Sequence, residues 1–90
     1  MKQKIIITNK TGLHARPASI FVQSAAKFAS QIYICKGDKR VNGKSILNVL
    51  SLGISKGSEI ILEIEGTDQE LAMHELTALL ASNFGEEENL

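Results

Sequence analysis

The sequence predicts an α+β fold in which an antiparallel sheet carries helices on one face and meets solvent on the other. The predicted order of elements is βαββαβα, with four strands and three helices. The strands alternate apolar and polar residues, which is typical of a sheet with one buried face. Ninety residues, 43% hydrophobic and 22% charged, suit one small globular domain. We expect that domain over residues 1–85, followed by an acidic tail over 86–90.

The first strand and helix are predicted from the N-terminal third of the chain. Residues 2–8 (KQKIIIT) are rich in β-branched side chains and favour a strand. A turn-rich loop follows at 9–13, and Pro17 suits the first turn of a helix, where its missing N–H is not needed. Apolar residues then recur at helical spacing and predict one buried face: Ala18, Phe21, Val22, Ala25, Ala26 and Ala29.

A hairpin and a short helix are predicted in the middle of the chain. Residues 31–36 (QIYICK) alternate as a strand does, and Gly37-Asp38 marks the turn into a short strand near 40–42. Ser45 is placed to cap a short helix, which ends at Gly53.

The last strand and helix follow without a linker. Residues 59–65 (EIILEIE) give the clearest strand, with Ile60, Leu62 and Ile64 facing inward. The string TDQE at 67–70 matches a capping box at the start of the last helix. The inner face of that helix is predicted to hold Ala72, Leu76, Leu79, Leu80 and Phe84.

Composition excludes several classes of protein. No apolar run approaches the ~20 residues of a membrane span, so we expect a cytoplasmic protein without one. Cys35 is the single cysteine, which rules out an internal disulfide and a cysteine-built zinc site. The ten Lys and Arg lie between Lys2 and Lys56, whereas nine of ten acids lie from Glu59 onward. This layout indicates charge pairing between strands, or a mildly basic surface for acidic partners. Direct nucleic-acid binding is not expected, because aromatic or groove-entering elements are missing.

His14 is the strongest candidate for chemistry. A histidine before a helix is, by residue type alone, most often a helix-entry residue. Here the helix N-terminus offers unpaired N–H groups and partial positive charge, which favour an anion such as phosphate. Arg16 adds a guanidinium, and cationic surroundings favour a neutral ring with a nucleophilic nitrogen. These features predict a phosphoryl acceptor. A metal site is disfavoured, because no second ligand lies nearby in sequence. The other histidine, His74, is expected on a solvated helix face.

Ser45 is a second candidate site. The simplest interpretation is an N-cap serine, which stabilises its helix by ~1 kcal/mol. A phosphate added there would lie at the positive end of the helix dipole, near Lys44. Cys35 is expected on the open side of the sheet, with nothing near it that activates the thiol.

Several apolar residues exceed what a small core can bury. Ile20 lies off the buried face of its helix, and Ile46, Leu47 and Leu50 belong to a short helix that is apolar nearly all round. An exposed patch of this kind commonly marks a partner surface, although a loosely wrapped small core would look the same.

Two motifs resemble a known family. GLHARPAS (12–19) and VNGKSILNVLSLGISKG (41–57) are similar to the HPr family of histidine-containing phosphocarriers of the bacterial phosphoenolpyruvate:sugar phosphotransferase system. The resemblance covers roughly residues 2–84. It implies an open-faced β-sandwich with a four-stranded antiparallel sheet and three helices on one face. It also implies that His14 accepts a phosphoryl group on Nδ1 from enzyme I and passes it to the A component of a sugar-specific enzyme II. Arg16 would contact the active centre. The chain would be a covalent carrier rather than an enzyme, and would need no cofactor.

The resemblance further implies regulation and a docking surface. Ser45 would be phosphorylated by HPr kinase/phosphorylase, and that form would act as corepressor of a catabolite-control transcription factor. Gly43, Leu47, Asn48 and Leu50 depart from residues common in Gram-positive members. The partner surface is expected to comprise Ala15, Arg16, Ser19, Ile20, Gln23, Lys44, Ile46, Leu47 and Leu50, on a monomer. The alternatives are a non-catalytic binding module and a relative that serves nitrogen or signalling control.

Overall fold

The predicted order of strands and helices is confirmed. The structure, a computed structural model, describes residues 1–85, and the tail expected at 86–90 lies outside them. The strands are β1 (Lys2–Ile6), β2 (Gln31–Lys36), β3 (Lys39–Asn42) and β4 (Glu59–Glu65). The helices are α1 (Ala15–Ala25), α2 (Ile46–Ser51) and α3 (Gln69–Ala81), followed by a 3₁₀ turn, η1 (Asn83–Gly85).

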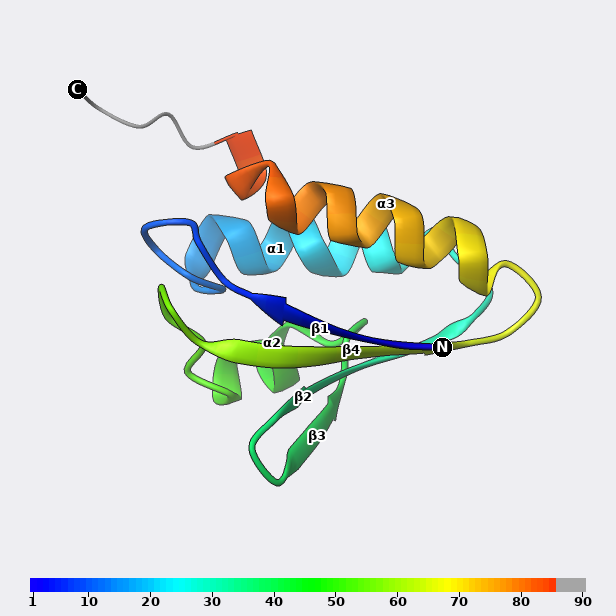
Figure 1. The fold of residues 1–90 in the computed structure, drawn as a ribbon, viewed down its shortest axis with the longest axis horizontal. Coiled ribbons are helices and arrows are strands. Elements are labelled where there is room, and N and C mark those ends of the chain that lie inside the picture. Colours follow the sequence, from blue (N-terminus) through cyan, green and yellow to red (C-terminus); the bar gives the residue numbers. More distant parts are fainter. Residues whose placement is uncertain (86–90) are drawn as a thin grey trace.

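The four strands form one antiparallel sheet in the order β1-β4-β2-β3 (Figure 1). Strand β4 pairs on both sides, with Ile60 opposite Ile5 of β1 and Leu62 opposite Ile34 of β2. Its alternation is as predicted: Ile60, Leu62 and Ile64 are buried, whereas the residues between them, Ile61 and Glu63, face the other side. The period of two therefore separates a core face from an open face.

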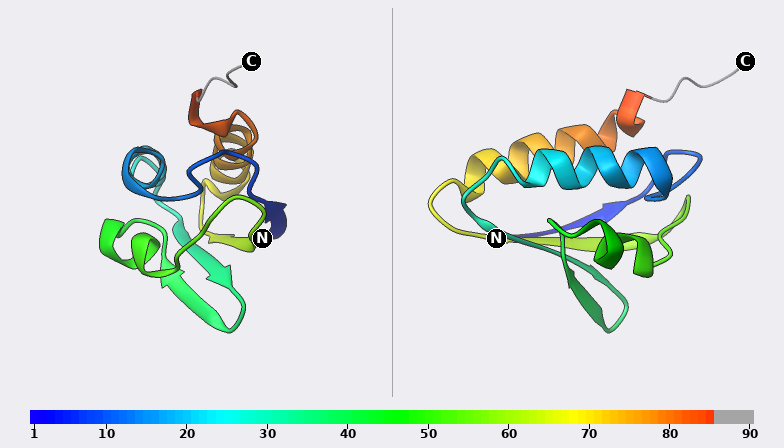
Figure 2. Two further views of the ribbon diagram at one scale, coloured as in Figure 1. Left: turned by 90° about the vertical axis from the view of Figure 1, so that its left-hand side faces the viewer. Right: turned by 180° about the vertical axis from the view of Figure 1, so that it is seen from behind.

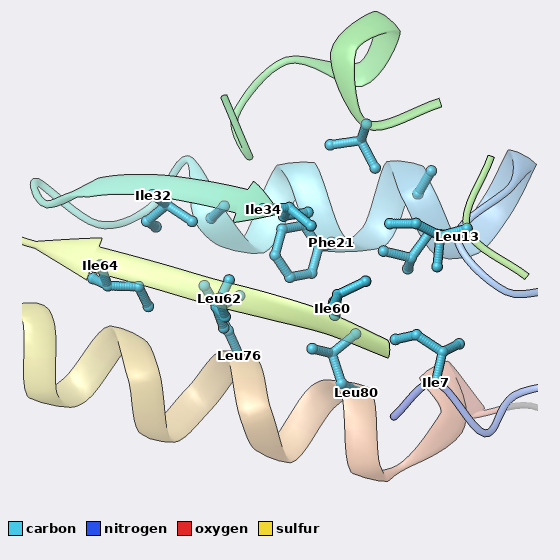
Figure 3. Close-up of a cluster of buried hydrophobic side chains, with 14 of the residues drawn as sticks. Ile7, Leu13, Phe21, Ile32, Ile34, Ile60, Leu62, Ile64, Leu76 and Leu80 are labelled. Atoms are coloured by element: carbon cyan, nitrogen blue, oxygen red, sulfur yellow. The ribbon is translucent and has the colours of Figure 1, made fainter. Parts of the chain in front are cut away.

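The helices cover the core face of this sheet. Helices α1 and α3 lie side by side over it, and α2 flanks α1 near β3 (Figures 1 and 2). Side chains from the strands meet side chains from α1 and α3 in a single cluster (Figure 3). Its labelled members are Ile7, Leu13, Phe21, Ile32, Ile34, Ile60, Leu62, Ile64, Leu76 and Leu80. The open-faced arrangement is the expected one.

Helix α1 is shorter than its apolar spacing predicts. It ends at Ala25, so Ala26 and Ala29 are exposed and the buried face predicted to include them was wrong there. The chain tightens into turns after Ala25 because it must reverse to enter β2. Phe28 packs into the core instead, with 7% of its surface exposed.

The predicted capping box at the start of α3 was also wrong. The N-cap residue is Asp68, whose side chain does not cap its own helix. The Asp68 carboxylate instead accepts hydrogen bonds from the Ser30 hydroxyl, the Ala29 N–H at 2.8 Å and the Ser30 N–H at 2.9 Å. These hydrogen bonds hold the pKa of Asp68 below its ordinary value, and the bond from the Ser30 hydroxyl has the largest effect. The side-chain oxygen of Gln69 accepts from the Gly66 N–H. The hydrogen bonds of Asp68 to the distant segment at Ala29 and Ser30 thus take the place of the local capping box predicted at 67–70.

Part of the uneven charge layout is accounted for by ion pairs between strands. Lys4 of β1 lies 3.9 Å from Glu59 of β4, and Arg40 of β3 donates to Glu63 of β4 at 3.0 Å. The Arg40 guanidinium lies 3.7 Å above the Tyr33 ring as it crosses β2. The basic and acidic segments of the sequence therefore meet on the open face of one sheet. Among residues 1–85, no helix is both long and apolar enough to cross a membrane.

Candidate functional site

The loop before α1 is fixed by backbone contacts. The Asn9 side-chain amide donates to the Gly12 carbonyl at 2.7 Å, and the Gly12 N–H donates back to the Asn9 carbonyl at 3.2 Å. The Leu13 N–H donates to the carbonyl of Ile54, in the segment between α2 and β4, at 3.0 Å. Leu13 itself is fully buried. These contacts therefore fix the position of the next residue, His14. The sequence predicted a turn-rich loop at 9–13 but not the contacts that hold it.

His14 lies at the N-terminus of α1 and is exposed, as predicted. Its backbone is extended, with φ −114° and ψ 158°, and its imidazole makes no capping hydrogen bond. The ring nitrogens are therefore not used to stabilise the helix. The following residue, Ala15, has φ 44°, in the left-handed region that costs a non-glycine residue about 1–2 kcal/mol. No sequence signal marks this strain, because alanine has no preference for that conformation.

Two backbone donors and a guanidinium surround the start of the helix. Pro17 has no N–H, and the Ala18 N–H donates to the His14 carbonyl at 3.5 Å. The N–H groups of Ala15 and Arg16 are then the first-turn donors left without an acceptor within residues 1–85. The Arg16 side chain is exposed next to them. Because the helix dipole adds positive potential, this end of α1 favours an anion.

His14 and Arg16 line a surface cavity of about 390 Å³. The other lining residues are Thr11, Ala15, Pro17, Ile20 and Phe84. Most of this wall is apolar. Sequence reasoning placed Phe84 on the inner face of the last helix and missed it here, because no local pattern connects it to His14.

Metal-ligating side chains do not cluster in the described part of the chain, and the second histidine is a surface residue. Within the described chain, no group of three or more His, Cys, Asp or Glu side chains could hold a metal ion. His74 lies exposed on α3, as expected.

Ser45 is the N-cap of α2, as predicted. Its hydroxyl accepts from the Asn48 N–H at 3.4 Å. The preceding Lys44 was expected to add positive charge beside it, but its ammonium donates to the Phe28 carbonyl at 2.7 Å. That bond ties Lys44 to the end of the α1 segment. Lys44 therefore holds two pieces of chain together as well as carrying charge.

The residues expected to form a partner surface lie on α1 and α2, which pack against each other. Exposed members are Ala15, Arg16, Gln23, Ile46 and Leu47, and half-buried members are Ser19, Ile20, Lys44 and Leu50. Leu47 is the most exposed large apolar residue of the described chain, at 75%. An apolar side chain held this far out stabilises the monomer little, so the patch is available for contact.

Cys35 carries a protonated thiol. Its sulfur donates to the Glu63 carboxylate at 3.0 Å. Partial burial, then this hydrogen bond and the Glu63 charge, raise the pKa of Cys35 to about 11, and nearby Arg40 offsets only part of the rise. The expectation of an unreactive thiol agrees with this geometry.

An exposed histidine at the head of a helix, on a small open-faced β-sandwich, defines the class of histidine phosphocarriers. The family model described as the PTS HPr component phosphorylation site matches residues 1–82, and the chain belongs to this HPr family. Members of the family are phosphocarrier proteins of the phosphotransferase system, not catalytic enzymes.

Individual relatives agree with this assignment. Phosphocarrier protein HPr of Neisseria meningitidis is 48% identical over 98% of this chain and 99% of its own. The HPr-like protein Crh of Bacillus subtilis is 44% identical, over 87% of this chain and 92% of its own. The crystal structure of an HPr from Thermoanaerobacter tengcongensis superposes with a TM-score of 0.95 at 52% identity, covering 98% of this chain and 99% of that one.

The expected monomer fits less well with other solved relatives. A second HPr structure from Thermoanaerobacter tengcongensis, 55% identical, is described as a dimer. A Crh structure from Bacillus subtilis, 42% identical, is described as an intertwined dimer with domain swapping. The oligomeric state of this chain therefore stays a prediction, which light scattering after size-exclusion chromatography would test.

Proposed function

We propose that the chain carries a phosphoryl group on His14, in the cytoplasm, from enzyme I to the A component of a sugar-specific enzyme II. The observation that supports this most is the exposed His14 imidazole. It is not used for capping, and it lies beside two N–H donors and the Arg16 guanidinium. A nucleophile next to an anion-binding helix terminus is the arrangement that a phosphoryl acceptor needs.

The transfer needs little from this chain beyond position and charge. The Nδ1 nitrogen of His14 attacks phosphorus, while the bond between phosphorus and the donor atom of enzyme I breaks and that atom keeps the electron pair. The reverse exchange delivers the group to the enzyme II component. Arg16 and the helix N–H groups stabilise the charge on the three remaining phosphoryl oxygens as the bonds exchange. A reactive phosphorus–nitrogen bond then conserves the transfer potential between the two partners.

The direct test is phosphorylation with phosphoenolpyruvate and enzyme I. We expect one acid-labile phosphate, which phosphorus NMR places on a ring nitrogen. His14→Ala should abolish it, and His74→Ala, the matched control at an exposed position of α3, should keep it. A phosphate retained by His14→Ala would exclude His14 as the acceptor. A wild-type chain that takes no phosphate would favour the non-catalytic binding module.

Arg16 is proposed to supply the side-chain charge. Arg16→Glu, alone or together with Lys44→Glu, should lower kcat/KM for phosphorylation by enzyme I by roughly 10- to 100-fold. Arg16→Lys should lose less, because it keeps the charge but not the forked donor geometry. An unchanged rate in the doubly reversed variant would refute the proposed charge contribution.

We also propose regulatory phosphorylation at Ser45 by HPr kinase/phosphorylase, with the product binding a catabolite-control transcription factor. The support is the N-cap position of Ser45 and the exposed apolar pair Ile46 and Leu47 directly after it. A phosphate at a helix N-terminus is stabilised by the dipole. Incubation with ATP and the kinase should label the wild type and Ser51→Ala but not Ser45→Ala. The absence of label in the wild type would instead favour a relative that serves nitrogen or signalling control.

A further inference from the structure

The end of the described chain supplies one wall of the cavity beside His14. Every other lining residue comes from the segment 11–20, whereas Phe84 comes from η1, at the far end of the sequence. Phe84 is also part of the hydrophobic core, with 8% of its surface exposed. Its ring therefore packs against the interior on one side and borders the candidate phosphoryl site on the other.

The turn that carries Phe84 is held in an unusual conformation. Asn83 and Phe84 have φ 57° and 55°, in the left-handed region that non-glycine residues avoid. Such a conformation persists only where surrounding contacts maintain it. Two contacts do so here: the burial of the Phe84 ring, and a hydrogen bond at 2.6 Å from the Thr8 hydroxyl to the Asn83 side-chain oxygen. Thr8 directly precedes the loop that leads to His14, so the bond joins that segment to the turn that carries Phe84.

We propose that Phe84 is a positioning residue of the phosphorylated site, which fixes an apolar wall beside His14 and restricts the approach of water to the phosphorus atom. This inference rests on the proposed function of His14. An apolar wall also lowers the local dielectric constant, which strengthens the attraction between the phosphoryl oxygens and Arg16. Phe84 thereby lengthens the time for which the carrier holds its group.

The step that Phe84 suppresses is hydrolysis of the carrier. A water oxygen forms a bond to phosphorus, and the bond between phosphorus and the imidazole nitrogen breaks. The nitrogen keeps the electron pair, and the products are inorganic phosphate and the free imidazole. A phosphocarrier gains from slowing this reaction, because each hydrolysed group is lost to the acceptor protein.

The test measures the lifetime of the phosphate on the intact chain. Wild type, Phe84→Ala and Phe84→Leu are phosphorylated by enzyme I and phosphoenolpyruvate, freed of both, and followed by phosphorus NMR. Phe84→Ala should lose its phosphate about 3- to 10-fold faster than the wild type. Phe84→Leu should lie close to the wild type, because it keeps a bulky apolar side chain. Leu71→Ala, which shortens an apolar side chain that is 55% exposed on α3, should decay as the wild type does.

Two further measurements separate positioning from folding. Thr8→Val removes the donor to Asn83 while keeping the shape of the side chain, and should accelerate hydrolysis less than Phe84→Ala but in the same direction. Thermal melting shows how stable each variant is. A Phe84→Ala chain that melts earlier yet loses its phosphate at the wild-type rate would overturn the inference. If Phe84→Ala does not fold, the Thr8→Val variant decides: a folded Thr8→Val chain that loses its phosphate at the wild-type rate would also overturn the inference.

The two proposals fail in different ways. If enzyme I does not phosphorylate the wild type, the proposed function is refuted, and phosphoramidate, a chemical phosphoryl donor, can still load the imidazole for the same decay measurement. If the wild type is phosphorylated and all variants decay equally, only the role of Phe84 is refuted.

Discussion

Gly12 lies directly against the backbone of Ile54. A Cβ atom on Gly12 would overlap the Ile54 carbonyl oxygen and come within 2.6 Å of the Ser55 Cα, and Gly12 has φ +61°. The same carbonyl accepts the Leu13 N–H at 3.0 Å. The loop that presents His14 is therefore docked, backbone to backbone, on the segment between α2 and β4.

This contact predicts a large difference between two glycines of the same conformation. Gly12→Ala should lower the free energy of unfolding by about 3 kcal/mol or more, because it adds a backbone clash to the left-handed strain. Gly37→Ala has the same φ of +61° but no atom within 4 Å of its Cβ, so about 1 kcal/mol is expected. Urea denaturation measures both. An equal decrease in the free energy of unfolding for both variants would show that the close approach of Gly12 to Ile54 does not affect stability.

The exposed position of Leu47 predicts an effect on binding without one on folding. Leu47→Ser should leave the melting temperature nearly unchanged, because the side chain is 75% exposed. It should raise KM for phosphorylation by enzyme I about 3- to 10-fold with a smaller change in kcat, as expected when docking contacts are lost. Leu71→Ser, the same substitution at an exposed position of α3, is the control. If both variants behave as the wild type, α2 is not a docking surface for enzyme I.

The raised pKa of Cys35 predicts slow alkylation. With a pKa of about 11 rather than 9.0, the thiolate fraction at pH 8 is roughly 100-fold smaller, so iodoacetamide should react correspondingly slowly with the folded chain. The rate is measured by mass spectrometry, and the unfolded chain in urea serves as reference. Equal rates in the folded and unfolded chains would contradict the assignment.

Two substitutions around Cys35 should act in opposite directions. Glu63→Gln removes a carboxylate that raises the pKa of Cys35 and should accelerate alkylation, although only in part, because burial is the larger cause. Arg40→Gln removes a charge that lowers this pKa and should slow alkylation further. Both substitutions break the Arg40–Glu63 ion pair. If loss of the pair were the cause, the alkylation rate of Cys35 would change in the same direction in both variants, which would contradict the prediction.

Asp68 predicts a pH-dependent stability. Its pKa is lowered in the folded chain, chiefly by the Ser30 hydroxyl and then by the Ala29 N–H. The stabilisation is therefore complete above the pKa of the unfolded chain, about 3.9, and is lost as the pH falls through the lower pKa of the folded chain. Asp68→Asn should melt at a lower temperature than wild type at pH 7, and the gap should narrow below about pH 4. A gap that stays constant with pH would contradict a role for the carboxylate charge.

The sequence predicted what depends on near neighbours. The alternation in 59–65 gave the orientation of β4, because side chains on a strand change face at every residue. The position of Ser45 before an apolar run gave the cap of α2, and Pro17 with the preceding histidine gave the start of α1. His14 could be singled out because the helix terminus, the arginine and the imidazole lie within three residues.

Contacts between distant segments decided the rest. Asp68 caps Ala29 and Ser30 rather than its own helix, and α1 ends at Ala25 because the chain must turn into β2. Phe84 reaches the His14 cavity only because η1 is docked on the core and on Thr8. Local spacing fixes which atoms can meet within one turn of helix or one pair of strands. A side chain that is distant in sequence, such as Phe84, completes a site only when helices and sheet pack and bring the two segments together. The local spacing of residues in the sequence does not predict such a contact.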